Sequence, residues 1–289
     1  MPDLAFVNGT VTLLEEAVIP IRDRGFLLAD GVYEVLRCYD GHIFEVEPHL
    51  DRLEGSLRGI GMRLPVSRRK LRQLLEELRR RSGHADARLY VQVTRGVAPR
   101  QHAFPRHARP SLVVYVEGVP RPRATIAGKG VAAITLRDWR WERCDLKTIA
   151  LLANVLAKQL AVEAGAHEAI FVGPDGSVRE GSSANVFAVR GREVWTHPLG
   201  PAILPGVSRA VLLRLARELG LRVRERRFGR RQLYAADEVL LSSTMQEVLP
   251  VVRIDGRPIG SGRPGPVARA LGERFRDRAR GAGSGGRRT

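Results

Sequence analysis

The irregular succession of strand-like and helix-like segments constrains the fold of this chain more than any other feature. Segments rich in β-branched residues, such as 87–94 and 131–136, are separated by amphipathic stretches such as 48–61. No steady alternation of strand and helix runs along the chain, which argues against a single parallel sheet of βαβ units. Because 289 residues exceed one typical domain, the pattern predicts two domains of the α+β class.

Turn and capping signals define the expected elements more closely. Asn8-Gly9 predicts a type I′ turn within a hairpin over residues 4–21, and Asp40-Gly41 predicts another turn after a strand at 30–39. Ser67 is a suitable N-cap for the helix that follows it. The other expected elements are helices at about 207–220 and 267–280, a turn at 22–25, and strands at 111–117, 168–172, 184–189, 194–196, 222–227 and 238–242.

The longest apolar segment covers residues 149–164 and is interrupted by polar residues. It is too broken for a membrane span, so we expect a core helix that follows Lys147 and ends near Gly165. The apolar residues on one face of this helix, which we expect to be buried, are Leu151, Leu152, Val155, Leu156 and Leu160.

A connector stiffened by prolines, residues 119–123, is expected to divide the chain. The prediction is a small N-terminal α+β domain at residues 1–119, a linker at 120–124 and a larger C-terminal domain at 125–280. Residues 281–289 are rich in Gly, Ser and Arg and are expected to be disordered.

Composition argues against several classes of protein. Two cysteines, Cys38 and Cys144, cannot form a disulfide framework or a four-ligand zinc site, so no metal is expected. The N-terminus has no basic region ahead of an apolar one, which argues against a signal peptide and favours the cytoplasm. The net charge of +17 is spread along the chain without interleaved aromatic residues, and a coding bias towards arginine explains it as well. A basic nucleic-acid-binding protein is therefore a remote alternative.

Lysine is rare in this sequence. Lys and Arg total 48, yet the lysines are only Lys70, Lys129, Lys147 and Lys158. Lys147 precedes the apolar helix, and its amine can attack a carbonyl and form a Schiff base, which an arginine cannot do. Taken alone, Lys147 also fits the commoner situation of a solvated surface lysine.

Other segments could supply what a pyridoxal phosphate enzyme requires besides its lysine. Glu180 stands where a turn enters a strand and can pair with the pyridine nitrogen. Gly206-Val207-Ser208 begins a helix whose N–H groups, with the hydroxyls of Ser243 and Thr244, can bind a phosphate, and Arg52 can clamp it. Each segment alone also fits an ordinary role: a solvated turn glutamate, a helix start, a strand-ending turn and a helix-surface charge.

Together these residues match a known signature, in which Glu-x-Ser-x-x-Asn-apolar-aromatic is followed by apolar-x-Thr and then apolar-x-Gly-apolar-x-basic. All of its elements occur here in order and spacing, so the chain resembles the class IV (fold type IV) pyridoxal phosphate aminotransferases. The similarity extends from Asp23-Arg24-Gly25 to residues 247–251. The matching residues are Glu180, Ser182, Asn185, Val186, Phe187, Val194, Thr196, Leu204, Gly206, Val207 and Arg209.

The resemblance implies a two-domain α+β fold of the D-amino-acid aminotransferase type, with pyridoxal 5'-phosphate as the cofactor. It implies that Lys147 forms the Schiff base and moves the proton between Cα and C4′, and that Glu180 pairs with the pyridine nitrogen. A ping-pong transfer of an amino group to a 2-oxo acid such as 2-oxoglutarate would follow. The residues that the resemblance assigns to the phosphate are Arg52, Val207, Ser208, Ser243 and Thr244.

The loop at 95–105 determines the expected substrate. Arg100-Gln101-His102 resembles the carboxylate-binding Arg-x-His of bacterial D-amino-acid aminotransferases, and Tyr33 would add a hydroxyl. In those enzymes the loop comes from the partner subunit, so a homodimer is implied. We therefore expect a D-amino acid such as D-alanine as donor, with a branched-chain L-amino-acid aminotransferase as the alternative on the same fold. Ala184 and Met245-Gln246 depart from the residues common in the D-enzymes and leave the preferred side chain open.

Overall fold

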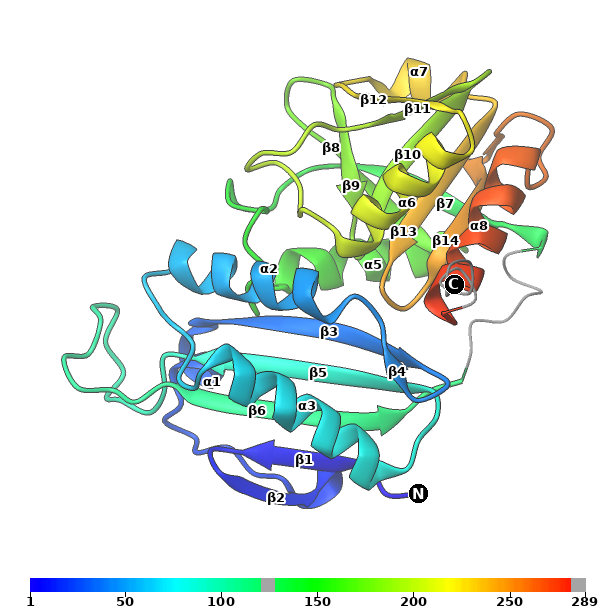
Figure 1. Ribbon diagram of the computed structural model, residues 1–289. Coiled ribbons are helices and arrows are strands. Elements are labelled where there is room, and N and C mark those ends of the chain that lie inside the picture. The colour runs from blue at the N-terminus through cyan, green and yellow to red at the C-terminus, as the bar shows by residue number, and fades with distance from the viewer. Residues whose placement is uncertain (121–127, 282–289) are drawn as a thin grey trace. The chain divides into compact units, whose positions relative to one another are not determined.

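The computed structural model describes residues 1–120 and 128–281. Most of the predicted linker at 120–124 and of the predicted disordered tail at 281–289 lies outside the described residues. The chain divides into two compact units, whose elements are labelled in Figure 1. Unit 1 comprises Met1–Arg121 with Leu146–Leu151, and unit 2 comprises Pro122–Asp145 with Leu152–Thr289. The segment that carries Lys147 therefore belongs to unit 1, although residues of unit 2 precede it in the chain.

In its described residues, unit 1 is built on a six-stranded antiparallel sheet in the order β2-β1-β6-β5-β3-β4. The long helices α2 and α3 lie along this sheet (Figure 1). The strands are β1 (Leu4–Val7), β2 (Thr10–Leu13), β3 (Gly31–Tyr39), β4 (His42–Ile43), β5 (Ala87–Thr94) and β6 (Ser111–Gly118). The helices are η1 (Leu14–Glu16), a 3-10 helix, and α1 (Arg24–Leu28), α2 (Val46–Gly59) and α3 (Arg68–Ser82).

Local sequence signals explain most of unit 1. Alternate residues of β5 face the core, where Leu89 and Val91 are fully buried beside leucines that recur at helical spacing in α2 and α3. Asn8 and Gly9 have φ values of +50° and +113°, as a type I′ turn requires, and the Ser67 hydroxyl caps α3 by accepting a hydrogen bond from the Lys70 N–H. The predicted hairpin turn, strands and cap are confirmed here.

The described residues of unit 2 form a nine-stranded mixed sheet in the order β12-β11-β10-β13-β14-β7-β8-β9, with β15 beside β14. β9 pairs with β8 and also with β10, through Glu180 and Asn185, so the strands from β10 to β9 close into a ring. The strands are β7 (Val131–Arg137), β8 (Glu168–Val172), β9 (Val178–Gly181), β10 (Asn185–Arg190), β11 (Glu193–Thr196), β12 (Arg222–Glu225), β13 (Glu238–Ser243), β14 (Glu247–Ile254) and β15 (Arg257–Pro258). The helices are α5 (Leu152–Glu163), α6 (Val207–Glu218), α7 (Arg230–Tyr234) and α8 (Pro266–Ala279).

The predicted turn at 22–25 is wrong from Arg24 onward, because a helix begins there. The side chain of Asp23 accepts a hydrogen bond from the Gly25 N–H and caps α1, which starts at Arg24. The predicted hairpin over 4–21 is also too long, since β2 ends at Leu13 and a 3-10 turn follows. Both errors concern short helical turns, which carry no periodic hydrophobic signal.

The prediction for the helix after Lys147 is wrong in its start and in its buried face. Residues 147–151 precede the helix, which begins at Leu152. Its buried side chains are Ala157 and Ala161, which pack with Ala169 and Phe171 of β8. The predicted core residues lie mostly outside this contact: Leu152 is 71% exposed, Val155 58%, Leu156 52% and Leu160 41%.

Two polar residues of α5 face inward instead. The Asn154 side chain donates a hydrogen bond to the Ser182 carbonyl (2.8 Å), and the Lys158 ammonium donates to the His167 carbonyl. The small alanines let α5 approach the sheet closely, which larger leucines would prevent. The leucine face of α5 is therefore an exposed apolar stripe.

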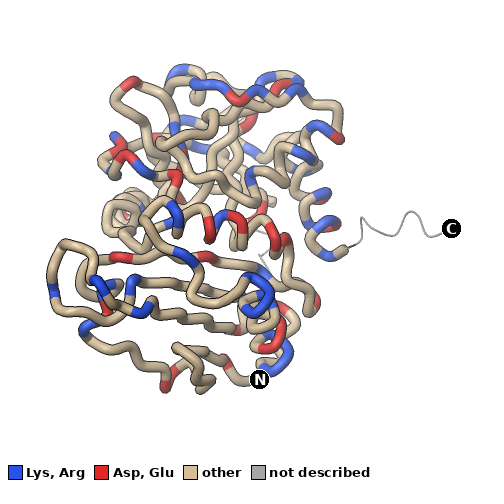
Figure 2. Tube along the Cα trace, turned by 60° about the vertical axis from the view of Figure 1, so that its left-hand side comes forward, with Lys and Arg blue, Asp and Glu red and all other residues tan. Residues whose placement is uncertain are grey.

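Charged residues are distributed over both units. Figure 2 shows Lys and Arg along the whole chain trace, with Asp and Glu interspersed among them. Many of the arginines form ion pairs, such as Arg68 with Glu47 and Asp51. Within residues 1–120 and 128–281, no helix has the length and apolar character needed to cross a membrane.

Candidate active site

Lys147 lies in an extended segment of unit 1 that runs beside β3. Its backbone N–H donates to the Ser56 hydroxyl (3.0 Å), and its carbonyl accepts from the Tyr33 N–H (2.9 Å). The half-buried ammonium lies 4.2 Å from the centre of the Tyr33 ring. It forms no ion pair or hydrogen bond with any residue that the structure describes, so backbone contacts hold the segment while the amine remains available.

A buried carboxylate lies near Lys147 in the same unit. Glu34 on β3 is fully buried, and Arg52 on α2 binds it with two hydrogen bonds, Nε to Oε1 (2.7 Å) and Nη2 to Oε2 (2.8 Å). Burial on its own raises the pKa of Glu34, but the charge and hydrogen bonds of Arg52, with a hydrogen bond from His49, lower it to about 2. The alternative of Arg52 as a solvated helix-surface charge is therefore wrong, because its side chain is 8% exposed.

His49 completes this group. Burial lowers the pKa of His49 despite its contact with Glu34, so the imidazole is neutral near pH 7 and its Nδ1–H donates to Glu34 Oε2 (2.8 Å). Glu34 thus remains ionised and fixes the position of the Arg52 guanidinium. A second positive charge in this buried site would be unfavourable beside Arg52 and Lys147.

Glu180 lies at the end of β9 in unit 2 and is 5% exposed, so the alternative of a solvated turn glutamate is wrong. Arg140 Nη1 donates to its Oε1 (2.5 Å), while Asn185 Nδ2 (3.1 Å) and the Leu204 N–H (2.9 Å) donate to Oε2. Arg140 is held in turn by Asp138, through Nη2 and Oδ2 (2.9 Å). Burial raises the pKa of Glu180, and the charge and hydrogen bond of Arg140 oppose that shift.

Other residues of the signature form hydrogen bonds close to Glu180. The Asn185 amide also donates to the Leu204 carbonyl (3.0 Å), and the Ser182 hydroxyl donates to the buried carboxylate of Glu168. Thr196 donates to the Val186 carbonyl (2.8 Å), which ties β11 to β10. Within the signature, Asn185 and Leu204 therefore bind Glu180 directly, while Ser182 and Thr196 fix the neighbouring turn and strands.

The glycine of the signature is required by close packing. A Cβ at Gly206 would lie 2.0 Å from Asn185 Oδ1, although the backbone φ of −65° is ordinary. We expect Gly206→Ala to lower the free energy of unfolding by about 1–3 kcal/mol, because the Asn185 amide must move. Urea denaturation measures this change, with Gly272→Ala as control, since its Cβ would meet only the end of the Arg276 side chain at 3.4 Å. Equal stability of both variants would contradict the packing argument.

The predicted phosphate-binding residues of unit 2 lie at the start of one helix and at the end of one strand. Val207 and Ser208 form the first turn of α6, whose N-cap Gly206 supplies no capping side chain. The first N–H groups of a helix have no intrahelical acceptor, and its dipole favours an anion there. Ser243 ends β13 and Thr244 follows it in the turn to β14. Beside them, the buried hydroxyl of Ser242 has no hydrogen-bond partner within residues 1–120 and 128–281.

The predicted substrate residues lie in unit 1. Arg100 and His102 are exposed, and their side chains form no hydrogen bond or ion pair with the described part of the chain. Tyr33 lies on β3, where its ring stacks on Tyr90 at 5.5 Å and supports the Lys147 ammonium. Unit 1 therefore holds Lys147, Arg52, Tyr33, Arg100 and His102, and unit 2 holds Glu180, Val207, Ser208, Ser243 and Thr244.

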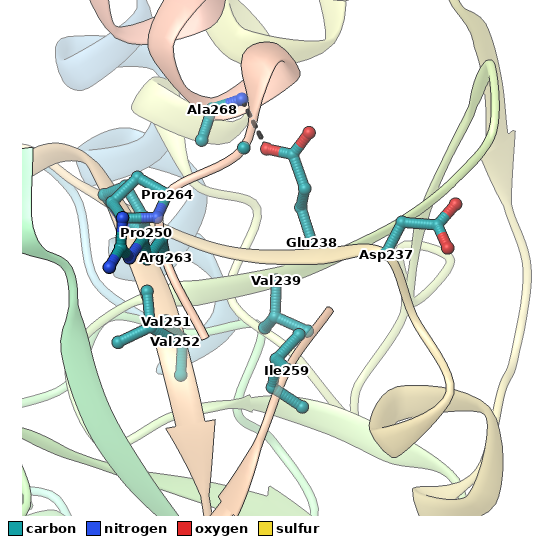
Figure 3. Close-up of a pocket in the computed structure, with 11 residues that line it drawn as sticks. Asp237, Glu238, Val239, Pro250, Val251, Val252, Ile259, Arg263, Pro264 and Ala268 are labelled. Atoms are coloured by element: carbon teal, nitrogen blue, oxygen red, sulfur yellow. Dashed lines mark hydrogen bonds between the residues drawn. The ribbon is translucent and has the colours of Figure 1, made fainter. Parts of the chain in front are cut away.

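A small pocket in unit 2 is distinct from these residues. It lies between β13, β14 and the start of α8 (Figure 3). The Glu238 carboxylate beside it already accepts the N–H groups of Val267 (3.0 Å) and Ala268 (2.7 Å), which begin α8. The pocket holds only about 10 Å³ of accessible space, roughly enough for one water molecule, so it does not fit an organic cofactor.

Several residues of these clusters were not found from the sequence. Glu34 gave a signal that could have been used, since it is a charge in the middle of an apolar strand. Asp138 and His49 gave none, because their importance depends on contacts with distant residues. Within the described residues, no group of three or more His, Cys, Asp or Glu side chains is placed to bind a metal ion.

This chain is similar to known proteins in both sequence and structure. The family model "Amino-transferase class IV" matches residues 31–254. A D-alanine aminotransferase from Bacillus licheniformis is 42% identical over 262 residues, which cover 91% of this chain and 92% of that protein. One from Staphylococcus aureus (strain N315) is 40% identical, covering 93% and 95%. The structure of a T.th. branched-chain amino acid aminotransferase with pyridoxamine 5'-phosphate is similar, with a TM-score of 0.91, 29% identity and coverage of 97% and 95%.

Proposed function

Because this chain belongs to the class IV aminotransferase family, we propose that it transfers the amino group of a D-amino acid to a 2-oxo acid with pyridoxal 5'-phosphate as cofactor. The predicted family, α+β fold and aminotransferase activity are confirmed. The choice of a D-amino acid is carried by one observation, the similarity to D-alanine aminotransferases at 40–42% identity over more than nine-tenths of the chain.

The residues of each unit fit the cofactor chemically. Unit 1 offers the Lys147 amine, which has no acidic partner in the described chain, and the buried Arg52. Unit 2 offers the buried carboxylate of Glu180, the glycine-capped start of α6 and the unsatisfied Ser242 hydroxyl. These are the amine, acid and anion-binding groups that the aldehyde, ring nitrogen and phosphate require.

The proposed roles follow from these environments. When bound, pyridoxal phosphate supplies an electron sink conjugated to the amino-acid Cα. Lys147 Nζ would hold the aldehyde and, once the substrate amine has displaced it, would carry the proton from Cα to C4′. Glu180 pairs with the ring nitrogen in an orientation set by Arg140 and Asn185. Arg52, Val207, Ser208, Ser243 and Thr244 hold the phosphate, and Tyr33, Arg100 and His102 bind the substrate carboxylate.

The alternative substrate class is a branched-chain L-amino acid, and the similar solved structure is named for branched-chain amino acids. Its lower identity, 29% against 42%, favours the D-amino acid. The deciding experiment compares D-alanine with L-leucine as donors to 2-oxoglutarate. We expect D-alanine to be preferred by at least about a hundredfold in kcat/KM. A preference for L-leucine would replace the proposed function with the alternative.

A colourless protein that shifts DNA in a salt-sensitive manner would instead support nucleic-acid binding as the purpose of the +17 charge.

The Arg100 loop provides a direct test of substrate binding. We expect Arg100→Ala and His102→Ala each to raise the KM for D-alanine about tenfold to a hundredfold, because each removes a charge-assisted or polar bond to the carboxylate. Steady-state kinetics measures the change, and the cofactor spectrum should be retained. Arg106→Ala is the control, since Arg106 is an exposed arginine in the same connection between β5 and β6. Equal KM values for all three variants and the wild type would exclude this role.

We also infer a homodimer and a cytoplasmic location. The exposed leucine face of α5 is the observation that supports a partner, because a water-facing row of large aliphatic side chains is unfavourable. In the homodimer predicted from the sequence, this partner is a second copy of the chain. The cytoplasmic location is supported by the cysteines Cys38 and Cys144, which are both free thiols. A reducing compartment keeps cysteines in this form.

The double variant Leu156→Glu, Leu160→Glu tests the homodimer. We expect the dimer dissociation constant to rise at least about thirtyfold, since charges replace buried anchors at the interface. Sedimentation velocity over a concentration series measures this constant. Val18→Glu serves as control, because Val18 is 79% exposed on a loop of unit 1. A wild-type monomer, or a dimer that tolerates the double variant, would show that this face has another purpose.

A further inference from the structure

A buried arginine holds the backbone of the loop that carries Arg100 and His102. Arg24 begins α1 and is 2% exposed. Its guanidinium donates to the carbonyls of Gln101 (Nη1, 2.5 Å), His102 (Nη2, 3.3 Å) and Ala103 (Nη1, 3.4 Å). One side chain thus fixes three consecutive carbonyls of a loop whose own side chains are exposed at these positions.

Arg24 is itself fixed by a carboxylate. Asp30 Oδ2 accepts from Arg24 Nε (2.7 Å) and from Arg95 Nε (2.9 Å). Burial raises the pKa of Asp30, but hydrogen bonds and charge from Arg95 and Arg24 lower it overall, so Asp30 is ionised at neutral pH. Arg95 reaches the other end of the loop, where its guanidinium lies 3.6 Å from the centre of the Phe104 ring. Burying two guanidinium groups is costly unless each is paired, and both pair with Asp30.

Two glycines let the backbone pack closely around this cluster. A Cβ at Gly25 would lie 2.3 Å from Thr94 Cγ2, so the missing side chain lets α1 approach the end of β5. Gly96 has a φ of +91°, and a Cβ there would lie 1.8 Å from the Arg109 carbonyl oxygen. The two ends of the loop therefore meet at Gly96, and the Arg24 N–H donates to the Gly96 carbonyl (2.9 Å).

The loop thus combines a fixed backbone with available side chains. Arg100 and His102 have no side-chain partner within the described residues, while the carbonyls around them are held. Fixing the backbone reduces the entropy that a ligand-binding loop would otherwise lose on binding. We propose that Arg24, held by Asp30, is a positioning residue that places Arg100 and His102 to bind the substrate carboxylate, an inference that rests on the proposed function.

The first test is kinetic. Arg24→Gln should raise the KM for D-alanine about tenfold to a hundredfold with kcat changed less than about threefold, because binding geometry is lost and the reacting amine is untouched. The cofactor absorbance should match that of the wild type. Arg68→Gln is the matched control, since Arg68 pairs with Glu47 and Asp51 on the surface of unit 1. An unchanged KM in a folded, cofactor-bound Arg24→Gln protein would overturn the inference.

A double-mutant cycle separates positioning from a general structural role. If Arg24 acts through Arg100, then Arg24→Gln added to Arg100→Ala should raise KM by less than about threefold beyond Arg100→Ala alone. Fully multiplicative effects would mean that Arg24 acts elsewhere, and would overturn the inference.

A third readout does not depend on activity. Trypsin cleavage between Arg100 and Gln101, followed by mass spectrometry, should be at least about tenfold faster in Arg24→Gln than in the wild type, because the freed loop opens more often. Unchanged cleavage would overturn the inference. A wild type inactive towards every D-amino acid but with the same trypsin result would overturn the proposed function and with it the substrate role, while the loop anchor would stand.

Arg24→Lys covers the case in which Arg24→Gln does not fold. Lysine keeps the charge opposite Asp30 but cannot span three carbonyls with a planar fork. We expect the same direction of change in KM and in trypsin cleavage, with a smaller size. A wild-type KM and cleavage rate in Arg24→Lys would overturn the inference.

Discussion

Lys147→Ala is expected to lower kcat at least about a thousandfold and to abolish the visible absorbance of the protein-bound cofactor. The amine both binds the cofactor aldehyde and moves the Cα proton, so two functions are lost together. The fold should survive, because the hydrogen bonds to Ser56 and Tyr33 come from the backbone of Lys147 and remain in the variant. Transamination assays and absorbance spectra provide the measurement.

Lys129→Ala is the control for this experiment. Lys129 is exposed, so its loss should leave both activity and spectrum unchanged. Persistent transamination by Lys147→Ala would remove Lys147 from the mechanism. Equal losses in both variants would point to an effect on folding instead.

Glu180→Gln is expected to lower kcat about a hundredfold to a thousandfold, because a neutral amide cannot stabilise a protonated ring nitrogen as a carboxylate does. The substitution also disturbs the buried network, because Arg140 Nη1 loses its ionic partner at Glu180 Oε1. Stopped-flow measurement of the half-reaction with D-alanine would locate the loss in the chemical step.

Glu238→Gln is the matched control, because Glu238 is also a buried glutamate of unit 2 (Figure 3). Its carboxylate binds the N–H groups at the start of α8, so we expect a loss of about 1 kcal/mol in unfolding free energy and an unchanged kcat. Wild-type kcat in Glu180→Gln would contradict the role given to Glu180.

The sequence predicted features that depend on neighbouring residues. The strand at 87–94 was predicted with its observed bounds, and the turns at Asn8-Gly9 and Asp40-Gly41 have the positive φ values that such turns require. The signature also predicted the residues of the Glu180 cluster, although not their contacts. Asn185, Leu204 and Gly206 meet around Glu180 only because β9 and β10 pair and α6 starts beside them.

Features that depend on distant contacts were missed. Hydrophobic spacing predicts that the apolar face of α5 packs against another surface, but it does not identify that surface. The prediction therefore places this face in the core of the unit. In the structure Ala157 and Ala161 face β8, since small side chains allow close packing, and the leucines face outward. Likewise, the pairing of Glu34 with Arg52 and of Asp30 with Arg24 joins residues whose proximity no local pattern indicates. The domain boundaries and the individual site roles stay predictions.

The most direct test of the account is to find which lysine carries the cofactor. Borohydride reduction of the yellow holoenzyme fixes the phosphopyridoxyl group covalently, and trypsin digestion with mass spectrometry then locates it among the four lysines. We predict one added group at Lys147, seen as the peptide of residues 144–158 uncleaved after Lys147. Labelling of Lys70, Lys129 or Lys158 instead, or no labelling of a coloured protein, would contradict the account.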